Sequence, residues 1–495
     1  MLRLLLLLFL PVSCPDTSFQ VWSPEVRYEI HIEPAKNLLE ISGSLDAIRP
    51  GTYFFVLPRT QGAPIQHFVR SLEFSDASGV LDYTLTDEKE WRVKTREESI
   101  HFKYSINLRQ AERYEREAWG GSTNLLDDRM AFLNGGFSFI IPLVKGLNSA
   151  IEVTWKVPPA WRVVTPWSDG SLYTIIPTQY ALVRNYYTAF KEGSGYSRRI
   201  RTMDLNTIWL GEDDINDFPQ AKRAIAKVVE AALMLFGYEA SREAVTLILR
   251  DSNSFNQFRA STEANSIEFN FKKGTTFNQL WNTYREGFLR LLAHEIMHTW
   301  DRREIEHASA YLHVPEWGPN TCWLREGFTE YFAMLNLYNA DIYDRTQFLS
   351  AMHALKNAAD NINADQSLDL SSSCASFYQN GRALQYVYTE GAALAFMLDL
   401  SLRESTNGVK TLPLFMQTFM TKYRYEEKTE EAFMREWKAY APRPLKDIKT
   451  QLERKQTTDL KEPLARMGIT LVANSPAHSP RWEIKTNAPF EWYFE

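Results

Sequence analysis

Three features are nearly absent from this chain of 495 residues, and each absence excludes a class of protein. Beyond the N-terminus, no run approaches the roughly 18 apolar residues that a membrane-spanning helix needs. The net charge is −6 and no basic run is present, which argues against nucleic acid as a partner. Only three cysteines occur, too few for a scaffold held together by disulfides. The chain is therefore predicted to be globular, with ample aromatic residues for a core.

The N-terminus has the pattern of an export signal. Residues 1–3 give a charged start, residues 4–10 form a short apolar core, and residues 11–14 supply a small-residue boundary. Residues 1–14 are therefore predicted to be a signal peptide. A cysteine after a small residue also resembles the cleavage box of a bacterial lipoprotein. We expect an exported protein, periplasmic, extracellular or tethered to the outer membrane, whose only membrane contact is a lipid on Cys14.

Only Cys322 and Cys374 are left in the mature chain. In an oxidising compartment they can form one disulfide. Two buried free thiols are the alternative, because unpaired cysteine packs well in a protein interior. Both interpretations are compatible with the sequence.

The most informative motif is His294-Glu295-Ile296-Met297-His298. Two imidazoles four positions apart lie on one face of a helix and can bind one metal ion, and Glu295 can reach a water on that ion. The motif is typical of zinc hydrolases, so zinc is the expected cofactor. A run of apolar residues at three- and four-residue steps leads into it and predicts one amphipathic helix that approaches a buried site: Phe277, Leu280, Trp281, Tyr284, Phe288, Leu291 and Leu292.

A second helix, predicted at residues 323–332, carries two carboxylates four positions apart. A catalytic zinc site has three protein ligands and one open position, so Glu326 is the expected third ligand. Glu330 is expected to accept the other N–H of a ligating histidine. His307 and His313 are the alternative third ligands, but no supporting carboxylate accompanies them on a helical face.

In the zinc motif HEIMHTW, the second histidine is separated by 27 residues from Glu326, the first glutamate of WLREGFTEYF. This arrangement resembles the glycyl aminopeptidase family of zinc peptidases, gluzincins that are related to aminopeptidase N. The resemblance implies a thermolysin-like catalytic fold and an enzyme that removes N-terminal residues from peptide substrates. The C-terminal PDZ domain that is common in the family is not expected, because only 23 residues follow its usual lead-in, residues 464–472.

The segment Tyr388-Thr389-Glu390-Gly391 resembles the family's Tyr-x-Lys-Gly block, although position 390 is Glu instead of Lys. The resemblance implies that Tyr388 stabilises the oxyanion of the tetrahedral intermediate, a role that suits a phenolic O–H. Tyr386 is the nearby alternative, and a packing residue with a satisfied hydroxyl is the simpler interpretation of either tyrosine.

The segment at residues 259–267 resembles the family's Gly-Gly-x-Glu strand, with Glu263 in the place of the glutamate. The resemblance implies that Glu263 binds the α-ammonium of the substrate. Both glycines are missing, which leaves an endopeptidase as an alternative to an aminopeptidase. Glu268 is a second candidate for the amine-binding carboxylate.

These residues predict metal-assisted hydrolysis of an amide. Zinc on His294, His298 and Glu326 polarises the scissile carbonyl, and Glu295 takes a proton from water and passes it to the leaving amine. A zinc endopeptidase and a non-catalytic peptide-binding protein on the same scaffold are the alternatives.

The predicted fold is a multidomain α+β protein, in which strands precede helices along the chain. Apolar and polar residues alternate at residues 26–32, 100–108 and 151–157, as in an antiparallel β domain with one buried face. The predicted segments are an N-terminal β domain at residues 20–199, a thermolysin-like catalytic domain at 200–340, a mostly α-helical lobe that completes the active-site cleft at 341–475, and a tail at 476–495.

Overall fold

The structure, a computed structural model, describes residues 25–58, 68–86, 90–108, 124–144, 147, 150–237, 244–252, 259–301, 317–318, 320–377, 379–424, 426–442, 448–466, 468–472 and 481–484. The predicted signal peptide, Cys14, His307 and His313 lie outside the described residues. No helix of the described part is long and apolar enough to cross a membrane.

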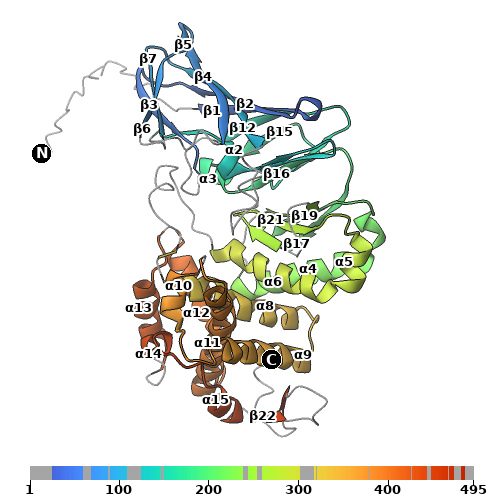
Figure 1. Cartoon of the computed structure of the whole chain (residues 1–495), viewed down its shortest axis with the longest axis vertical. Coiled ribbons are helices and arrows are strands. Elements are labelled where there is room, and N and C mark those ends of the chain that lie inside the picture. Colours follow the sequence, from blue (N-terminus) through green and yellow to red (C-terminus); the bar gives the residue numbers. More distant parts are fainter. Residues whose placement is uncertain are drawn as a thin grey trace, which may run out of the picture.

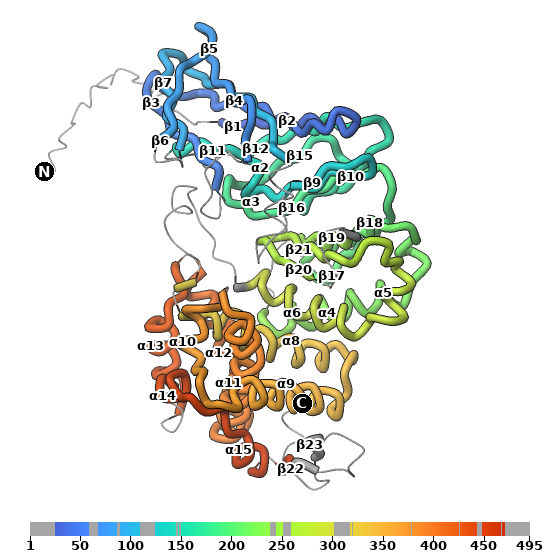
Figure 2. Tube along the Cα trace, viewed as in Figure 1, coloured from blue at the N-terminus to red at the C-terminus, as the bar shows by residue number. Residues whose placement is uncertain are grey.

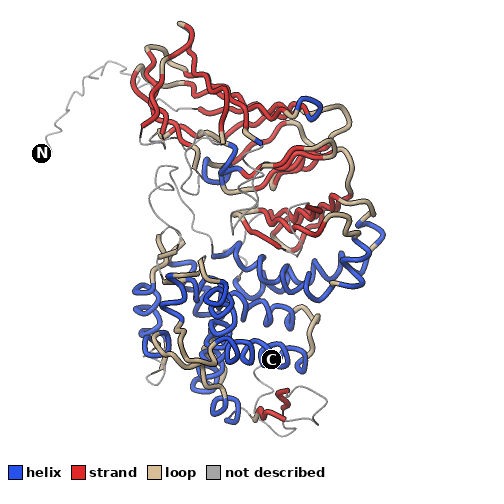
Figure 3. The backbone as a smooth tube through the Cα atoms, viewed as in Figure 1, coloured by secondary structure: helices blue, strands red, loops and turns tan. Residues whose placement is uncertain are grey.

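Strands and helices are segregated along the long axis of the molecule (Figure 3). The N-terminal β domain lies at one end, the sheet of the predicted catalytic domain with its helices lies in the middle, and a helical lobe lies at the other end (Figure 1). This arrangement confirms the predicted fold class.

The N-terminal domain is built from three sheets. The largest has the strand order β15-β12-β1-β2-β8-β4-β5, and the others have the orders β14-β13-β16-β10-β9 and β11-β3-β7-β6. Most pairs are antiparallel, as predicted, but β1 and β12 are parallel. The elements are β1 (Glu25–Glu33), η1 (Pro34–Lys36), β2 (Leu38–Asp46), β3 (Gly51–Val56), β4 (Val69–Asp76), β5 (Gly79–Leu81), β6 (Tyr83–Thr86), β7 (Glu90–Thr95), β8 (Ile100–Ile106), β9 (Leu125–Leu126), β10 (Met130–Asn134), α2 (Gly135–Ser138), β11 (Ile141–Pro142), β12 (Ile151–Lys156), β13 (Arg162–Thr165), β14 (Ser168–Asp169), β15 (Tyr173–Ile176), α3 (Gln179–Val183) and β16 (Tyr186–Phe190).

The catalytic domain contains a five-stranded sheet of order β17-β18-β19-β21-β20. Strands β18, β19 and β21 are parallel, and the edge strands β17 and β20 are antiparallel to their neighbours. Residues 244–250 of the central strand β19 are all buried and mostly apolar, as expected for a strand covered on both faces. The elements are β17 (Ser194–Ile200), β18 (Met203–Leu210), η3 (Ile215–Asp217), α4 (Pro219–Phe236), β19 (Ala244–Ser252), β20 (Arg259–Thr262), β21 (Ser266–Lys272), α5 (Phe277–Thr283) and α6 (Arg285–Asp301).

Two features of this domain differ from the sequence prediction. Its sheet begins at β17, slightly before residue 200, because β17 is an edge strand whose exposed Arg198 and Arg199 hide any apolar alternation. The single helix predicted to lead into the zinc motif is two helices. The chain leaves helical geometry at Tyr284, which is 45% exposed and closes α5, and α6 starts at the next residue.

The helical lobe follows the catalytic domain and packs against its helices (Figure 1). The prediction that this part of the chain is mostly helical is confirmed. The elements are η4 (Trp323–Gly327), α8 (Phe328–Asn339), α9 (Arg345–Ile362), α10 (Leu370–Ala375), α11 (Gly381–Thr406), α12 (Leu412–Lys422), α13 (Glu430–Tyr440), α14 (Lys449–Leu452), α15 (Lys461–Arg466), β22 (Ile469–Val472) and β23 (Arg481–Ile484).

The N-terminal domain meets the catalytic domain sheet against sheet, with β16 and β10 facing β18, β19 and β21 (Figure 2). A fully buried ion pair between Arg250 and Glu268 lies at this contact, and the Arg250 guanidinium lies 4.8 Å from the centre of the Phe132 ring. Apolar side chains from both sheets surround this pair: Met130, Phe132, Val164, Tyr186, Phe190, Ile208, Leu210 and Ile248.

A buried carboxyl group in α11 anchors the chain beyond α14. Glu390 Oε1 accepts hydrogen bonds from the backbone N–H and the hydroxyl of Thr458, both at 2.6 Å. Burial raises the pKa of Glu390 to about 7, although the two bonds from Thr458 act in the opposite direction. In the folded protein the neutral carboxylic acid therefore predominates below about pH 7.

This raised pKa predicts a pH-dependent stability. A carboxyl whose pKa is higher in the folded state stabilises the fold fully below its unfolded pKa, and this contribution is lost as the pH rises through about 7. Glu390→Gln removes the titration. Between pH 5 and pH 8, the free energy of unfolding of the variant should therefore rise relative to the wild type by about 2 kcal/mol. Denaturant unfolding at both pH values measures this difference, and parallel pH profiles of the two proteins would contradict it.

Candidate metal centre

Three donor atoms from two helical segments converge in the interior. The Nε2 atoms of His294 and His298, both on α6, lie 3.1 Å apart, and each lies 3.4 Å from Oε2 of Glu326 in η4. All three side chains are buried. They are the one group in the described part of the chain in which three His, Cys, Asp or Glu side chains could hold a metal ion together.

The donor set and its spacing fit zinc. Zinc binds imidazole nitrogen and carboxylate oxygen at about 2.0–2.2 Å with tetrahedral angles, so its ligand atoms lie about 3.3 Å from one another. The observed separations of 3.1 to 3.4 Å match this triangle. Three protein ligands leave a fourth position free, as in catalytic zinc sites.

A ladder of charged groups supports the donor atoms. On α6, Arg290, His294 and His298 follow one another at four-residue steps and share one face, and Glu326 and Glu330 have the same spacing on the facing segment. Glu330 Oε2 lies 2.9 Å from Nδ1 of His294, and Glu330 Oε1 accepts a hydrogen bond of 2.8 Å from Nε of Arg290. Nδ1 of His294 is thereby held by Glu330, and Nε2 is directed toward the other donors.

The charge balance of the site favours a cation. Burial opposes protonation of His294, but its contacts with Glu326 and Glu330 outweigh burial and raise its pKa to about 10. Burial would likewise raise the pKa of Glu330, yet His294 and the charge of Arg290 lower it to about 2. The two carboxylates therefore favour a positive charge between the helices, which a divalent metal ion can supply.

Glu326 lies in a turn of π-helix, Trp323–Gly327, which continues into α8. Such wide turns are frequent at functional sites. Its last residue, Gly327, crosses Gly391 of α11 in backbone contact, because a Cβ added to Gly327 would lie 2.6 Å from Cα of Gly391. No larger residue fits at this crossing without displacing backbone.

The close crossing brings Tyr388, one helical turn before Gly391, next to the metal donors. Tyr388 Oη donates a hydrogen bond of 2.9 Å to Oε2 of Glu326. Burial first, and then the charge of Glu326, raise the pKa of Tyr388 well above its usual value, so the phenol stays protonated. Tyr386, the alternative, instead accepts a hydrogen bond from Asn363, 3.2 Å away.

Glu295 points from α6 toward the end of the edge strand β20. Thr262, the last residue of β20, lies with its hydroxyl oxygen 2.6 Å from Oε2 of Glu295 and 2.9 Å from the Glu295 carbonyl oxygen. The glutamate of the zinc motif is thus held beside the metal ligands by the neighbouring sheet.

The predicted amine-binding residue, Glu263, follows Thr262 directly and is almost fully buried. Its Oε2 lies 3.1 Å from Nε of Arg184, which the N-terminal domain contributes. The backbones are joined as well, since the N–H of Ala264 donates to the carbonyl of Arg184 at 2.8 Å. The other candidate, Glu268, is buried in its ion pair with Arg250.

Two protein-family models match this chain, one in the N-terminal β domain and one in the region of the metal donors. Residues 26–183 match the N-terminal domain of peptidase M61, and residues 287–394 match the M61 glycyl aminopeptidase model. The chain belongs to the M61 glycyl aminopeptidase family. No curated protein matches the sequence significantly.

Solved structures share the fold at low sequence identity. A protein of the aminopeptidase N family from Idiomarina loihiensis is 18% identical, with a TM-score of 0.73 over 94% of this chain and 80% of that one. A mutant M1 zinc metallopeptidase from Deinococcus radiodurans, bound to a Tyr-Ser-Ala substrate, is 12% identical, with a TM-score of 0.55 over 89% of this chain and 96% of that one. The M61 chain therefore has the fold of an M1-like metallopeptidase.

Several residues at the site were not identified from the sequence. Arg290 could have been found, because it stands four positions before His294 and completes the ladder on α6. Thr262 could also have been found, because it directly precedes Glu263 in the segment at residues 259–267 that resembles the family's strand. Arg184 has no such signal, because it lies far from Glu263 along the chain and only the packing of the two domains brings it close.

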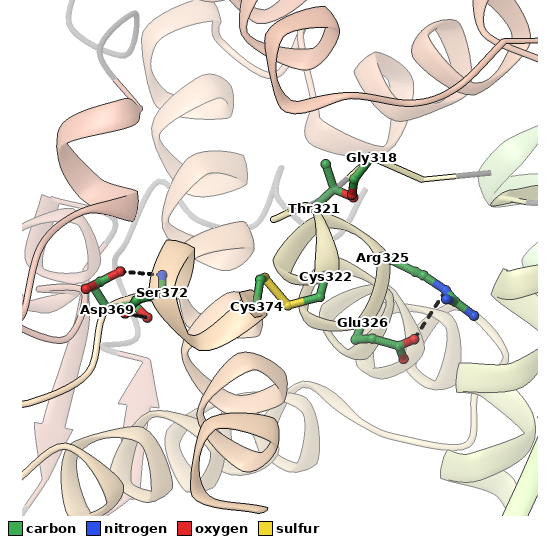
Figure 4. The surroundings of a disulfide bond; sticks show 8 residues. All are labelled: Gly318, Thr321, Cys322, Arg325, Glu326, Asp369, Ser372 and Cys374. Carbon is green, nitrogen blue, oxygen red and sulfur yellow. Dashed lines mark hydrogen bonds and ion pairs between the residues drawn. A yellow bond between two sulfur atoms is a disulfide. The ribbon is translucent and has the colours of Figure 1, made fainter. Parts of the chain in front are cut away.

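A disulfide between Cys322 and Cys374 fixes the segment that carries Glu326 (Figure 4). Cys322 directly precedes the π turn, and Cys374 lies in α10, just before α11 with its Tyr388. Of the two interpretations that the sequence allowed, the structure has the bridge. On the opposite side of η4, Arg325 lies 3.3 Å from Oε1 of Glu326 (Figure 4).

Removal of the disulfide is predicted to weaken both the fold and the metal site. The bridge spans 52 residues, and a loop of that length stabilises the folded state by about 4 kcal/mol through chain entropy. Replacing both cysteines with serine should lower the free energy of unfolding by this order and weaken zinc binding, since η4 loses its anchor. Thermal unfolding and zinc titration measure both effects. Reductant should affect the wild type and leave the double variant unchanged; an equal response of the two would contradict the assignment.

Proposed function

We propose that the protein is a zinc-dependent aminopeptidase that hydrolyses the N-terminal bond of peptides. The observation that carries the proposal is the triangle of donor atoms from His294, His298 and Glu326, with the carboxylate of Glu295 held alongside. The M61 family and the M1-like fold support peptide hydrolysis in general.

The proposed mechanism assigns a separate task to each side chain. When bound, zinc supplies Lewis-acid polarisation of the scissile carbonyl and lowers the pKa of water. Glu295 takes a proton from the attacking water and passes it to the leaving amine. The Tyr388 phenol, protonated because of its raised pKa, turns its O–H from Glu326 to the developing oxyanion. Glu330 and Arg290 keep His294 in the ligating orientation.

Replacement of the general base should separate catalysis from metal binding. Glu295→Gln keeps the size of the side chain and all three metal ligands, so zinc content should stay at wild-type level. Turnover should fall about 10²- to 10⁴-fold, because the proton acceptor is lost. Peptide hydrolysis and zinc analysis of the same protein sample test this, and turnover close to wild type would refute the role of Glu295.

The matched comparison is His298→Ala, which removes a ligand and leaves the base in place. This variant should lose zinc and turnover together. A His298→Ala protein that still binds one zinc ion as tightly as the wild type would refute the ligand set.

A second candidate function, a zinc endopeptidase, is favoured by the ion pair of Glu263. In an aminopeptidase, a carboxylate must pair with the desolvated α-ammonium of the substrate, and Glu263 is the proposed partner. The guanidinium of Arg184 already lies 3.1 Å from this carboxylate. A substrate ammonium would meet this like charge, whereas an internal segment of a longer peptide would not.

One peptide set, offered with free and with acetylated N-termini, separates the two activities. Release of the first residue from free peptides only is the result expected for an aminopeptidase, and Glu263→Gln should then raise KM for the free peptides more than it lowers kcat. Equal cleavage of blocked peptides at internal bonds would establish the endopeptidase instead. If neither the free nor the acetylated peptides are cleaved, the result would favour a non-catalytic peptide-binding protein.

We also propose that the protein is exported. The charged start, apolar core and small-residue boundary of residues 1–14 support this, and a lipid on Cys14 is the proposed membrane anchor. The disulfide between Cys322 and Cys374 is compatible with an oxidising compartment.

A further inference from the structure

The carboxylate of Glu295 has one hydrogen-bond partner among the described residues, and this partner is Thr262. The Thr262 hydroxyl lies 2.6 Å from Oε2 of Glu295 and 2.9 Å from the backbone carbonyl oxygen of the same residue. Both oxygens are acceptors, so the hydroxyl is the donor. Thr262 itself is buried, with 3% of its surface exposed.

We propose that Thr262 is a positioning residue that fixes the carboxylate of Glu295, an inference that rests on the proposed function of Glu295 as the general base. The single O–H proton lies between two oxygens of one residue, so it ties the end of the Glu295 side chain to the Glu295 backbone. In this contact Oε2 of Glu295 accepts the hydrogen bond from Thr262. Oε1 is then the oxygen that takes the proton of the attacking water.

The contact is compatible with both protonation states of the base. Before the transfer, Oε2 is a carboxylate oxygen and accepts the Thr262 hydrogen bond. After Oε1 has taken the proton, Oε2 is the carbonyl oxygen of a carboxylic acid and still accepts it. The side chain therefore does not have to rotate between taking a proton from water and giving it to the leaving amine.

The position of Thr262 in the sheet makes the contact rigid. Thr262 ends β20, where its backbone pairs with Ile267 of β21. The next residue, Glu263, is held by Arg184 of the N-terminal domain. Strand pairing on one side and an ion pair on the other hold the hydroxyl at a fixed distance from α6. A long side chain such as glutamate gains orientation from such a contact, and geometry within about 0.5 Å governs the efficiency of proton transfer.

The decisive variant is Thr262→Val, which keeps the shape of the side chain and removes the hydroxyl. We expect kcat to fall about 10-fold or more, with KM changed less than about twofold and with wild-type zinc content and melting temperature. Thr262→Ser restores the hydroxyl and should return kcat close to wild type. In a crystal structure of the Thr262→Val protein, the Glu295 side chain should occupy more than one conformer.

The matched control is Thr246→Val. Thr246 is a buried threonine in β19 of the same sheet, and its hydroxyl has no hydrogen-bond partner among the described residues. Its loss should leave kcat, KM and zinc content unchanged. In the Glu295→Gln background, adding Thr262→Val should cause little further loss, because the two side chains act as a unit.

The outcomes separate this inference from the proposed function. An active wild type whose Thr262→Val variant keeps its full kcat, or loses no more than Thr246→Val does, overturns the role of Thr262 alone. Failure of Thr262→Ser to recover activity also overturns it, since the hydroxyl would then not be the active feature. A zinc-loaded wild type that hydrolyses no peptide overturns the proposed function and this inference with it.

Discussion

The contact on which the site depends is the crossing of two backbones at Gly327 and Gly391. A Cβ on either glycine would lie 2.6 or 2.7 Å from the Cα of the other, so the two segments touch without side chains between them. Because Glu326 precedes Gly327 and Tyr388 stands one turn before Gly391, this crossing sets the 2.9 Å contact between their side chains. Glu326, the residue next to this crossing, is also the ligand that completes the group of metal donors with the two histidines of α6.

The second constraint is the attachment of the N-terminal β domain to the strand end beside the site. Arg184 binds Glu263 through its side chain and Ala264 through its carbonyl, and the side-chain oxygen of Asn185 accepts a hydrogen bond from the Asn265 N–H at 2.8 Å. The N-terminal domain therefore does more than cover the catalytic sheet, because it holds the segment that contacts Glu295. These contacts restrain that segment, which suits the proposed role of Glu295 as a pre-positioned base.

The sequence predicted what depends on local spacing. The helical repeat placed His294 and His298 on one face, and a carboxylate at position 326 completed a ligand set that the structure brings together. The sequence could not predict the break at Tyr284, the π turn or the partner of Glu263. The first two are local geometries that depend on tertiary packing, and the third joins two domains. The pairing of the cysteines was equally open, because it depends on where η4 and α10 meet.

The π turn also determines how the chain tolerates changes in length. A π turn contains one residue more than the corresponding α-helical turn, so it sets the angular phase between Cys322 before it and Glu330 after it. Deleting one residue within the turn would return it to α-helical geometry and preserve this phase. Deleting one residue from the regular helix between the turn and Glu330 would instead rotate the two sides by about 100° relative to each other. In that second case the chain could keep either the disulfide to α10 or the contact of Glu330 with His294, but not both. A deletion at residues 328–329 should therefore be tolerated far less than a deletion within the π turn.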